Sequence, residues 1–184
     1  SKKINGVWDS VVELSINNNN YNVTFPHISA DGNTLYFCSD MPGGMGGLDI
    51  YYVEKLGNNQ WSTPVNLGPE VNTYEDETYP FVMDNKFFFS SKGREGFGGF
   101  DIYQGSINDK KITNCNNIGA PINSSKDDFS YVLSDDGKTG YFSSNREGTH
   151  GYDKIYYFEM KNTRQWIEGV VKNGENGNPI AGVE

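Results

Sequence analysis

The fold is decided by a stretch that runs from Phe25 to Tyr52 and reads FPHISADGNTLYFCSDMPGGMGGLDIYY. It recurs from Tyr79 as YPFVMDNKFFFSSKGREGFGGFDIY and from Phe129 as FSYVLSDDGKTGYFSSNREGTHGYDKIYY. Each copy carries one aspartate near its end, at a spacing of 52 and 52 residues: Asp49, Asp101 and Asp153. Equal, in-phase copies at such a period are the signature of a repeat architecture.

A second repeated unit lies between the copies. The segment Gln60–Asn72, QWSTPVNLGPEVN, is echoed by Ile118–Asn123 and, ahead of the first copy, by Val7–Asn17. Each repeat therefore divides into four short stretches of β-branched and aromatic residues that are separated by turn residues. The first, innermost strand of a repeat is expected over Thr78–Met83. The second is expected over Leu35–Ser39, Lys86–Ser90 and Gly140–Ser143 in the three repeats. The third is expected over Asp49–Val53, and the fourth, outermost strand over Trp61–Leu67.

Four antiparallel strands every 52 residues predict an all-β fold of β-propeller blades. The pairs Asp31-Gly32 and Asp136-Gly137 are expected as structural hairpin turns, because glycine accepts positive φ. The second repeat shortens this turn to Asp84-Asn85, and Ser130 replaces the proline in the third repeat. Lys154, inserted after Asp153, is expected to shift or bulge the strand that follows.

The predicted propeller segment covers residues 1–161, with a leading outer strand over 4–14 and repeats over 22–68, 76–119 and 127–158. Closed propellers have roughly four to eight blades. About three blades therefore predict a partial propeller, whose open edges need further blades or a partner chain. Residues 162–184 are expected to form a linker and the first, truncated β-hairpin of another domain.

Composition agrees with a packed β chain and limits the partners. The 184 residues include 22 glycines, 22 asparagines and 26 aromatic residues, which favour turns and strands over helices. A net charge of −9 opposes binding to nucleic acid and to anionic membranes. No stretch reaches the 18 or so apolar residues of a membrane span, and Cys38 and Cys115 are expected as two buried free thiols.

The pattern P-x-x-S-x-D-G-x-x-L-Y-F-x-S, followed by G-G-x-D-I-Y and W-S-x-P-x-x-L-G, resembles the TolB-type propeller repeat. The link Leu67–Glu77 is more narrowly similar to the version in OmpA-family, PorE-like envelope proteins of Bacteroidetes. Residues 166–183 resemble the opening hairpin of a carboxypeptidase-regulatory-like domain. The resemblance implies a periplasmic location at the outer membrane and a place in type IX secretion or gliding machinery.

The function that this resemblance implies is non-catalytic binding or scaffolding of other envelope proteins, with no cofactor. Peptidoglycan would be bound only through a downstream OmpA-like domain that these residues do not include. Two alternatives stay open, namely a glycan-binding propeller that uses loop aromatics and an accessory domain of a propeller hydrolase. Catalysis by this segment is not expected, because His27 and His150 occupy non-equivalent positions and no nucleophile signature accompanies them.

The glycine-rich loops and their aspartates have structural and functional interpretations. Phosphate-cradling loops precede a helix N-terminus, whereas a strand is predicted after Gly47 and Gly99, so structural loops are favoured. Asp49, Asp101 and Asp153 are interpreted as acceptors for backbone N–H groups of their own turns, in preference to a metal site. The acidic links Glu75-Asp76-Glu77 and Asp127-Asp128 are interpreted as a solvated rim, with a calcium or cation site as the alternative.

Aromatic residues divide into strand and loop groups. Strand aromatics are expected between the blades: Tyr36, Phe37, Phe87, Phe88, Phe89, Tyr141 and Phe142. Arginine and aromatic side chains on loops are the usual anchors of protein interfaces. The candidate partner or ligand contacts are therefore Arg94, Phe97, Phe100, Arg146 and Tyr152, with packing beneath the loops as the alternative.

Overall fold

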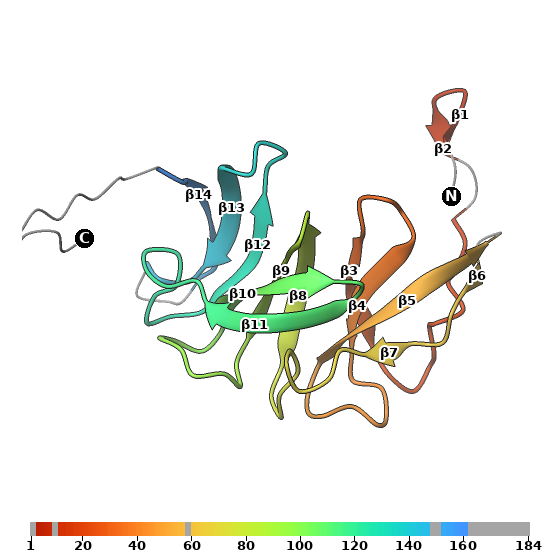
Figure 1. The fold of residues 1–184 in the computed structure, drawn as a ribbon, viewed down its shortest axis with the longest axis horizontal. Coiled ribbons are helices and arrows are strands. Elements are labelled where there is room, and N and C mark those ends of the chain that lie inside the picture. The colour runs from red at the N-terminus through yellow and green to blue at the C-terminus, as the bar shows by residue number, and fades with distance from the viewer. Residues whose placement is uncertain (1–2, 9–10, 58–59, 148–151, 162–184) are drawn as a thin grey trace, which may run out of the picture.

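The structure is a computed structural model that describes residues 3–8, 11–57, 60–147 and 152–161. Three antiparallel sheets stand side by side, and a small hairpin lies at one end (Figure 1). The described residues form no helix. The predicted all-β fold of blade-like antiparallel sheets is confirmed.

Each sheet is one sequence repeat, and its strands run in chain order. The first blade contains β3 (Val23–Ile28), β4 (Thr34–Ser39), β5 (Asp49–Gly57), β6 (Gln60–Trp61) and β7 (Val65–Asn66). The second contains β8 (Glu77–Met83), β9 (Lys86–Ser91), β10 (Asp101–Asn108) and β11 (Lys111–Asn117). The third contains β12 (Asp128–Leu133), β13 (Thr139–Ser144) and β14 (Lys154–Glu159). Both β6 and β7 pair with β5, so the predicted outer strand 61–67 is interrupted around Pro64.

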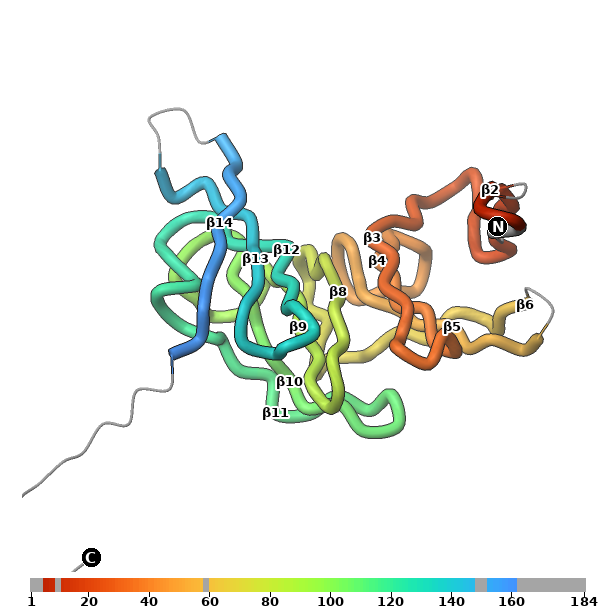
Figure 2. Tube along the Cα trace, turned by 90° about the horizontal axis from the view of Figure 1, so that it is seen from above, coloured from red at the N-terminus to blue at the C-terminus, as the bar shows by residue number. Residues whose placement is uncertain are grey.

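The predicted leading outer strand over 4–14 is wrong. β1 (Lys3–Ile4) and β2 (Val7–Trp8) pair with each other, and residues 11–14 belong to no strand. Asn5 and Gly6 have φ values of 51° and 83°, which suit a two-residue turn between paired strands. This hairpin and β14 lie at opposite ends of the row of sheets, so the leading segment does not close onto β14 (Figures 1 and 2). The hairpin predicted within 162–184 lies outside the described residues.

The inner strand of every blade carries a bulge at the same place. The pairing register shifts after Thr24, Thr78 and Phe129. A residue with positive φ lies in each bulge, namely Phe25 at 50°, Tyr79 at 52° and Ser130 at 57°. Ser130 therefore takes the place of Phe25 and Tyr79, and Tyr131 takes the place of the proline. The sequence alignment at this point was wrong by one residue.

The inserted Lys154 also changes an equivalence. Asp49 pairs with Ser39 and Asp101 pairs with Ser91, but Lys154 pairs with Ser144. Ile155 and Tyr156, which follow this position, fix the register. The Tyr156 ring stacks on Phe142 of the neighbouring strand and packs against the cluster shared with the preceding blade. The extra residue therefore moves Asp153 out of the strand, and Asp153 is exposed and not equivalent to Asp49 and Asp101.

The core lies between the blades. We call the side chains that a blade packs against the preceding blade its front face, and those that it packs against the next blade its back face. The back face of the first blade meets the front face of the second in one buried cluster: Tyr36, Cys38, Ile50, Phe87, Phe89 and Tyr103. The second and third blades meet in the same manner through Phe88, Ile102, Tyr131 and Phe142.

Two of the sequence expectations about buried groups need correction. Tyr141, predicted between blades, lies on the exposed back face of the third blade. Both cysteines are free thiols, as predicted, but only Cys38 is buried and Cys115 is half-buried. Burial raises the pKa of the Cys38 thiol well above its ordinary value and that of Cys115 to about 11.

A buried asparagine joins each blade to the link that leads to the next blade. The Asn72 side chain accepts the Ile50 N–H at 2.8 Å and donates to the Ile50 carbonyl at 3.0 Å. Asn123 does the same for Ile102, at 2.9 and 2.8 Å. The Ile50 and Ile102 carbonyls also accept the Leu67 and Ile118 N–H groups, so the amide side chain adds a donor there and supplies the acceptor for the N–H of the third strand. We call this arrangement the asparagine clip.

Replacing Asn72 or Asn123 by Ala should cost about 1–3 kcal/mol of unfolding free energy, because the buried N–H of Ile50 or Ile102 loses its acceptor, while the carbonyl keeps the Leu67 or Ile118 N–H. Chemical denaturation measures the loss. Asn20→Ala, at an exposed position, is the matched control and should change stability by less than about 0.5 kcal/mol. Equal stabilities of the clip variants and the control would show that the clip does not hold the link.

Candidate functional site

The loops after β4 and β9 present one apolar side chain each at their tips. Met45 and Phe97 occupy equivalent positions, each between two glycines, and both side chains are exposed. Asp49 Oδ2 accepts the Met45 N–H at 2.5 Å, and Asp101 Oδ2 accepts the Phe97 N–H at 2.6 Å. The buried carboxylate therefore fixes the backbone of the residue whose side chain is displayed.

Each tip loop is also held by the next blade's link. A Cβ on Gly46 would collide with the backbone of Tyr74, and a Cβ on Gly98 would collide with the backbone of Lys126. The Leu48 N–H donates to Asp76 at 3.0 Å, and the Phe100 N–H donates to Asp127 at 2.9 Å. The glycines thus permit close packing between blades, and a strand follows the loops, which argues against phosphate binding.

Gly98→Ala should lower the unfolding free energy by about 2–3 kcal/mol, because the new methyl group pushes the loop away from the Lys126 backbone. Thermal unfolding measures the effect. Phe97→Ala, one residue away on the exposed tip, is the control and should leave the midpoint nearly unchanged. A Gly98→Ala variant as stable as the Phe97→Ala variant would contradict the close packing.

The candidate contact residues Arg94 and Arg146 are not presented to solvent as interface anchors. Arg94 donates to the carbonyls of Glu70 and Val71, and Arg146 donates to those of Pro121 and Ile122. Arg94 lies over the Phe89 and Tyr103 rings, and Arg146 lies over Phe142 and Tyr156. Both guanidinium groups hold the preceding link on the blade, so their prediction as partner contacts is not supported.

The other candidate aromatics differ in exposure. Phe100 is half-buried, with its ring 6.3 Å from that of Phe129 and Lys92 Nζ 4.6 Å above it. Tyr152 is exposed just before β14, and residues 148–151 ahead of it lie outside the described part of the chain. Of the five candidates, Phe97 and Tyr152 therefore present exposed rings.

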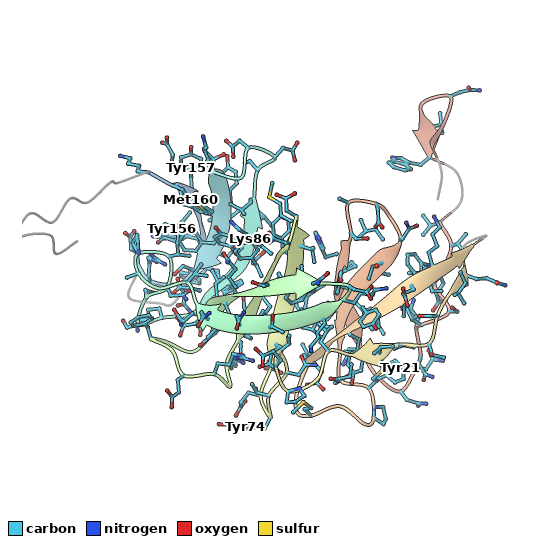
Figure 3. The ribbon with its side chains drawn as sticks, viewed as in Figure 1. Tyr21, Tyr74, Lys86, Tyr156, Tyr157 and Met160 are labelled. Atoms are coloured by element: carbon cyan, nitrogen blue, oxygen red, sulfur yellow. The ribbon has the colours of Figure 1, made fainter. Side chains whose placement is uncertain are left out.

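Tyr74 belongs to the same face and was missed by the sequence analysis. It lies on the link between the first two blades, and its side chain is exposed. Figure 3 shows it projecting from the side of the molecule that carries the loops after β4 and β9. An aromatic residue inside an acidic link could have signalled this position. We call Met45, Tyr74 and Phe97 the loop face.

The acidic links are not the predicted solvated rim throughout. Glu77 and Asp128 are buried: Glu77 accepts from Thr73 and Ser91, and Asp128 from Ser124 and Arg146. Burial raises the pKa of Glu77, and its hydrogen bonds oppose that rise. Asp76 and Asp127 bridge two blades, and the Leu48 N–H donates to Asp76 and lowers its pKa. These carboxylates serve packing, and the part of the chain that the structure describes brings no three His, Cys, Asp or Glu side chains together as a metal site.

The turns at Asp31-Gly32 and Asp136-Gly137 lie at the other end of the strands. Gly32 and Gly137 have φ values of 70° and 64°, and each N–H donates to the serine three residues earlier. Asp31 accepts the Asn33 N–H, and Asp136 accepts the Lys138 and Thr139 N–H groups. These residues shape the hairpins.

The three inner-strand bulges meet in a small cavity of about 180 Å³. Phe25 and Tyr79 have ring centroids 4.2 Å apart, and His27 and Phe81 lie 5.0 Å apart. The Val82 N–H donates to His27 Nε2 at 3.0 Å, so this nitrogen must carry a lone pair. Burial lowers the pKa of His27 below 6.5, and protonation would break the bond that links two blades.

His27 should therefore stabilise the fold above pH 6.5 and lose that contribution as the pH falls through its lowered folded-state pKa. Denaturation of the natural chain and of His27→Gln, between about pH 7.5 and about pH 5, measures this effect. The loss on acidification should be smaller in the variant, which keeps an acceptor but does not titrate. Identical pH profiles would contradict a neutral, bonded His27.

Comparison with known proteins adds little to these observations. No protein-family model matches the sequence, and no curated protein matches it. Among solved structures, an α-L-arabinofuranosidase from Lactobacillus brevis is similar over 92% of this chain and 57% of that chain, at 12% identity and a TM-score of 0.45. The match spans 57% of that chain, and a likeness of this size carries no argument. No described segment is a helix long and apolar enough to cross a membrane.

Proposed function

We propose that this chain is a non-catalytic propeller segment that binds and positions other proteins through its loop face. The observation that carries the proposal is the repeated display of Met45 and Phe97 on backbone fixed by buried Asp49 and Asp101. Loops whose backbone is already fixed lose little backbone entropy on binding, which favours the use of their exposed apolar side chains as interface anchors.

The spacing of the anchors supports a protein partner. Met45 and Phe97 come from successive blades, and Tyr74 comes from the link between those blades. The glycine loops and links are packed against each other, so the three side chains are held at fixed separations. A partner that contacts all three would span a blade-to-blade interval, which is the scale of a protein surface.

We further propose that the module belongs to a bacterial envelope protein of the OmpA family, in the periplasm at the outer membrane. Its repeat and link motifs support this placement, and type IX secretion or gliding machinery is the setting that those motifs favour. The net charge of −9 disfavours nucleic acid and anionic lipid surfaces as partners. Peptidoglycan attachment is assigned to a domain outside these residues.

Binding of the immobilised chain to solubilised outer-membrane proteins of a Bacteroidetes species tests the proposal. Phe97→Ser and Met45→Ser should each weaken capture of the bound protein by at least about tenfold, as for a hot-spot side chain. Leu56→Ser is the matched control, because Leu56 is at least as exposed as Met45 and Phe97 but lies on β5, away from the tip loops. It should leave capture unchanged.

Two outcomes would contradict the proposal. Capture that is equal for the loop-face variants and the Leu56 control would place the binding surface elsewhere. Retention of peptidoglycan fragments that is lost with Phe97→Ser, without any protein capture, would favour the glycan-binding alternative.

A further inference from the structure

A polar groove of about 360 Å³ lies between the first two blades, at the end of the strands that is opposite to the tip loops. Aspartates from three different turns line it: Asp31 between β3 and β4, Asp84 between β8 and β9, and Asp109 between β10 and β11. Figures 1 and 2 show the tip of the β10–β11 hairpin pointing toward the first blade. The walls of the groove thus belong to two neighbouring blades within the row.

The groove has an excess of negative charge. Lys110 is the one cationic side chain among the described residues that line it. Its Nζ lies 2.6 Å from a carboxylate oxygen of Glu54 and 3.3 Å from one of Asp109. Lys110 is therefore already neutralised by its neighbours, and the carboxylates of Asp31 and Asp84 add charge that the groove does not compensate.

Asp84 is the carboxylate that remains available to a ligand. Both oxygens of Asp31 accept hydrogen bonds from Ser29 or Asn33. Asp84 forms neither a hydrogen bond nor an ion pair with the part of the chain that the structure describes, and it is exposed. Its φ of 53° places it on the tight turn between β8 and β9, so the backbone that carries the carboxylate is fixed.

The Tyr36 side chain brings a second unpaired polar group to the groove. Tyr36 is 2% exposed, and its ring packs 5.5 Å from Phe87 and 6.2 Å from Tyr52. Its side chain lines the groove, and its hydroxyl has no hydrogen-bond partner among residues 3–8, 11–57, 60–147 and 152–161. Burial raises the pKa of Tyr36 to about 12, so the hydroxyl is neutral at neutral pH. Because a buried tyrosine hydroxyl usually has a partner, this one points to a group that enters the groove.

Apolar side chains lie beside these polar groups and limit the kind of ligand. Ala30, Val82 and Ile107 line the groove together with the aspartates. An ammonium group on an alkyl chain matches this lining, because the chain covers apolar surface while the head donates several hydrogen bonds. A metal ion fits less well, since the described residues bring no three His, Cys, Asp or Glu side chains together.

We propose that this groove binds a primary ammonium group on an alkyl chain, as presented by a lysine side chain or by a free diamine. The ammonium group donates to the Asp84 carboxylate and to the Tyr36 hydroxyl oxygen, and the alkyl chain lies along Val82 and Ile107. This site is separate from the loop face, so it goes beyond the proposed function and does not rest on it.

Titration of the natural chain, followed by its amide NMR signals, tests the site with two probes, cadaverine and Nα-acetyl-lysine methylamide. Both should bind and shift the signals of residues that line the groove, whereas the uncharged Nα-acetyl-norleucine methylamide should not. Asp84→Asn and Tyr36→Phe should each raise the Kd at least about tenfold, because each removes a hydrogen bond to a charged group. The probe that binds more tightly distinguishes a free diamine from a protein side chain as the ligand.

Asp135→Asn is the matched control. Asp135 is an exposed aspartate in the turn before β13 of the third blade, and the same loss of charge there should leave the Kd unchanged. Asparagine tolerates the positive φ of position 84, and phenylalanine keeps the ring of Tyr36, so both test variants should fold, as their NMR spectra can check.

Three outcomes would overturn the proposal. One is a natural chain that binds neither ammonium probe. Another is an Asp84→Asn variant that binds the probes as tightly as the natural chain. The third is calcium that binds more tightly than the probes and shifts the same signals, which would assign the groove to a metal ion.

Discussion

The asparagine clip is the interaction on which the arrangement of the blades depends. A four-stranded sheet buries its faces only when a neighbour covers them, and the chain must therefore pass from one blade to the next in a fixed direction. Asn72 and Asn123 fix that passage by bonding both backbone groups of Ile50 and Ile102. The amide side chain supplies one acceptor for the backbone N–H and a second donor to the carbonyl, which no apolar residue could do.

The remaining polar contacts follow from the position that the clip gives the link. Once the link crosses the blade edge, its carbonyls face the Arg94 or Arg146 guanidinium group. Its carboxylates reach backwards to the loop N–H groups at Leu48 and Phe100. The loop can approach this closely because Gly46 and Gly98 have no side chain. Rigid loop tips are thus a consequence of blade packing, and the loop face uses that rigidity.

The repeat period and the alternation of turn and strand residues were sufficient to predict the blades. They did not predict details in which a single residue changes position. The bulge shows that Ser130 is equivalent to Phe25 and Tyr79, so the aromatic Phe129 misled the alignment by one residue. Lys154 is an extra residue, which the loop absorbs while the strand register stays fixed. Arg94 and Arg146 were expected at a surface contact, but the carbonyls that they bond come from a link more than 20 residues earlier. Such distant partners leave no local pattern.

By itself, the sequence determined that the chain is all-β, that it repeats every 52 residues, and which residues form the hairpin turns. These properties depend on local backbone preferences and on the alternation of side chains, which are encoded within a few residues. Only the tertiary structure decided that Glu77 and Asp128 are buried and that Met45, Tyr74 and Phe97 are exposed. Burial depends on what lies across the next blade, and that neighbour is set by the packing of whole sheets.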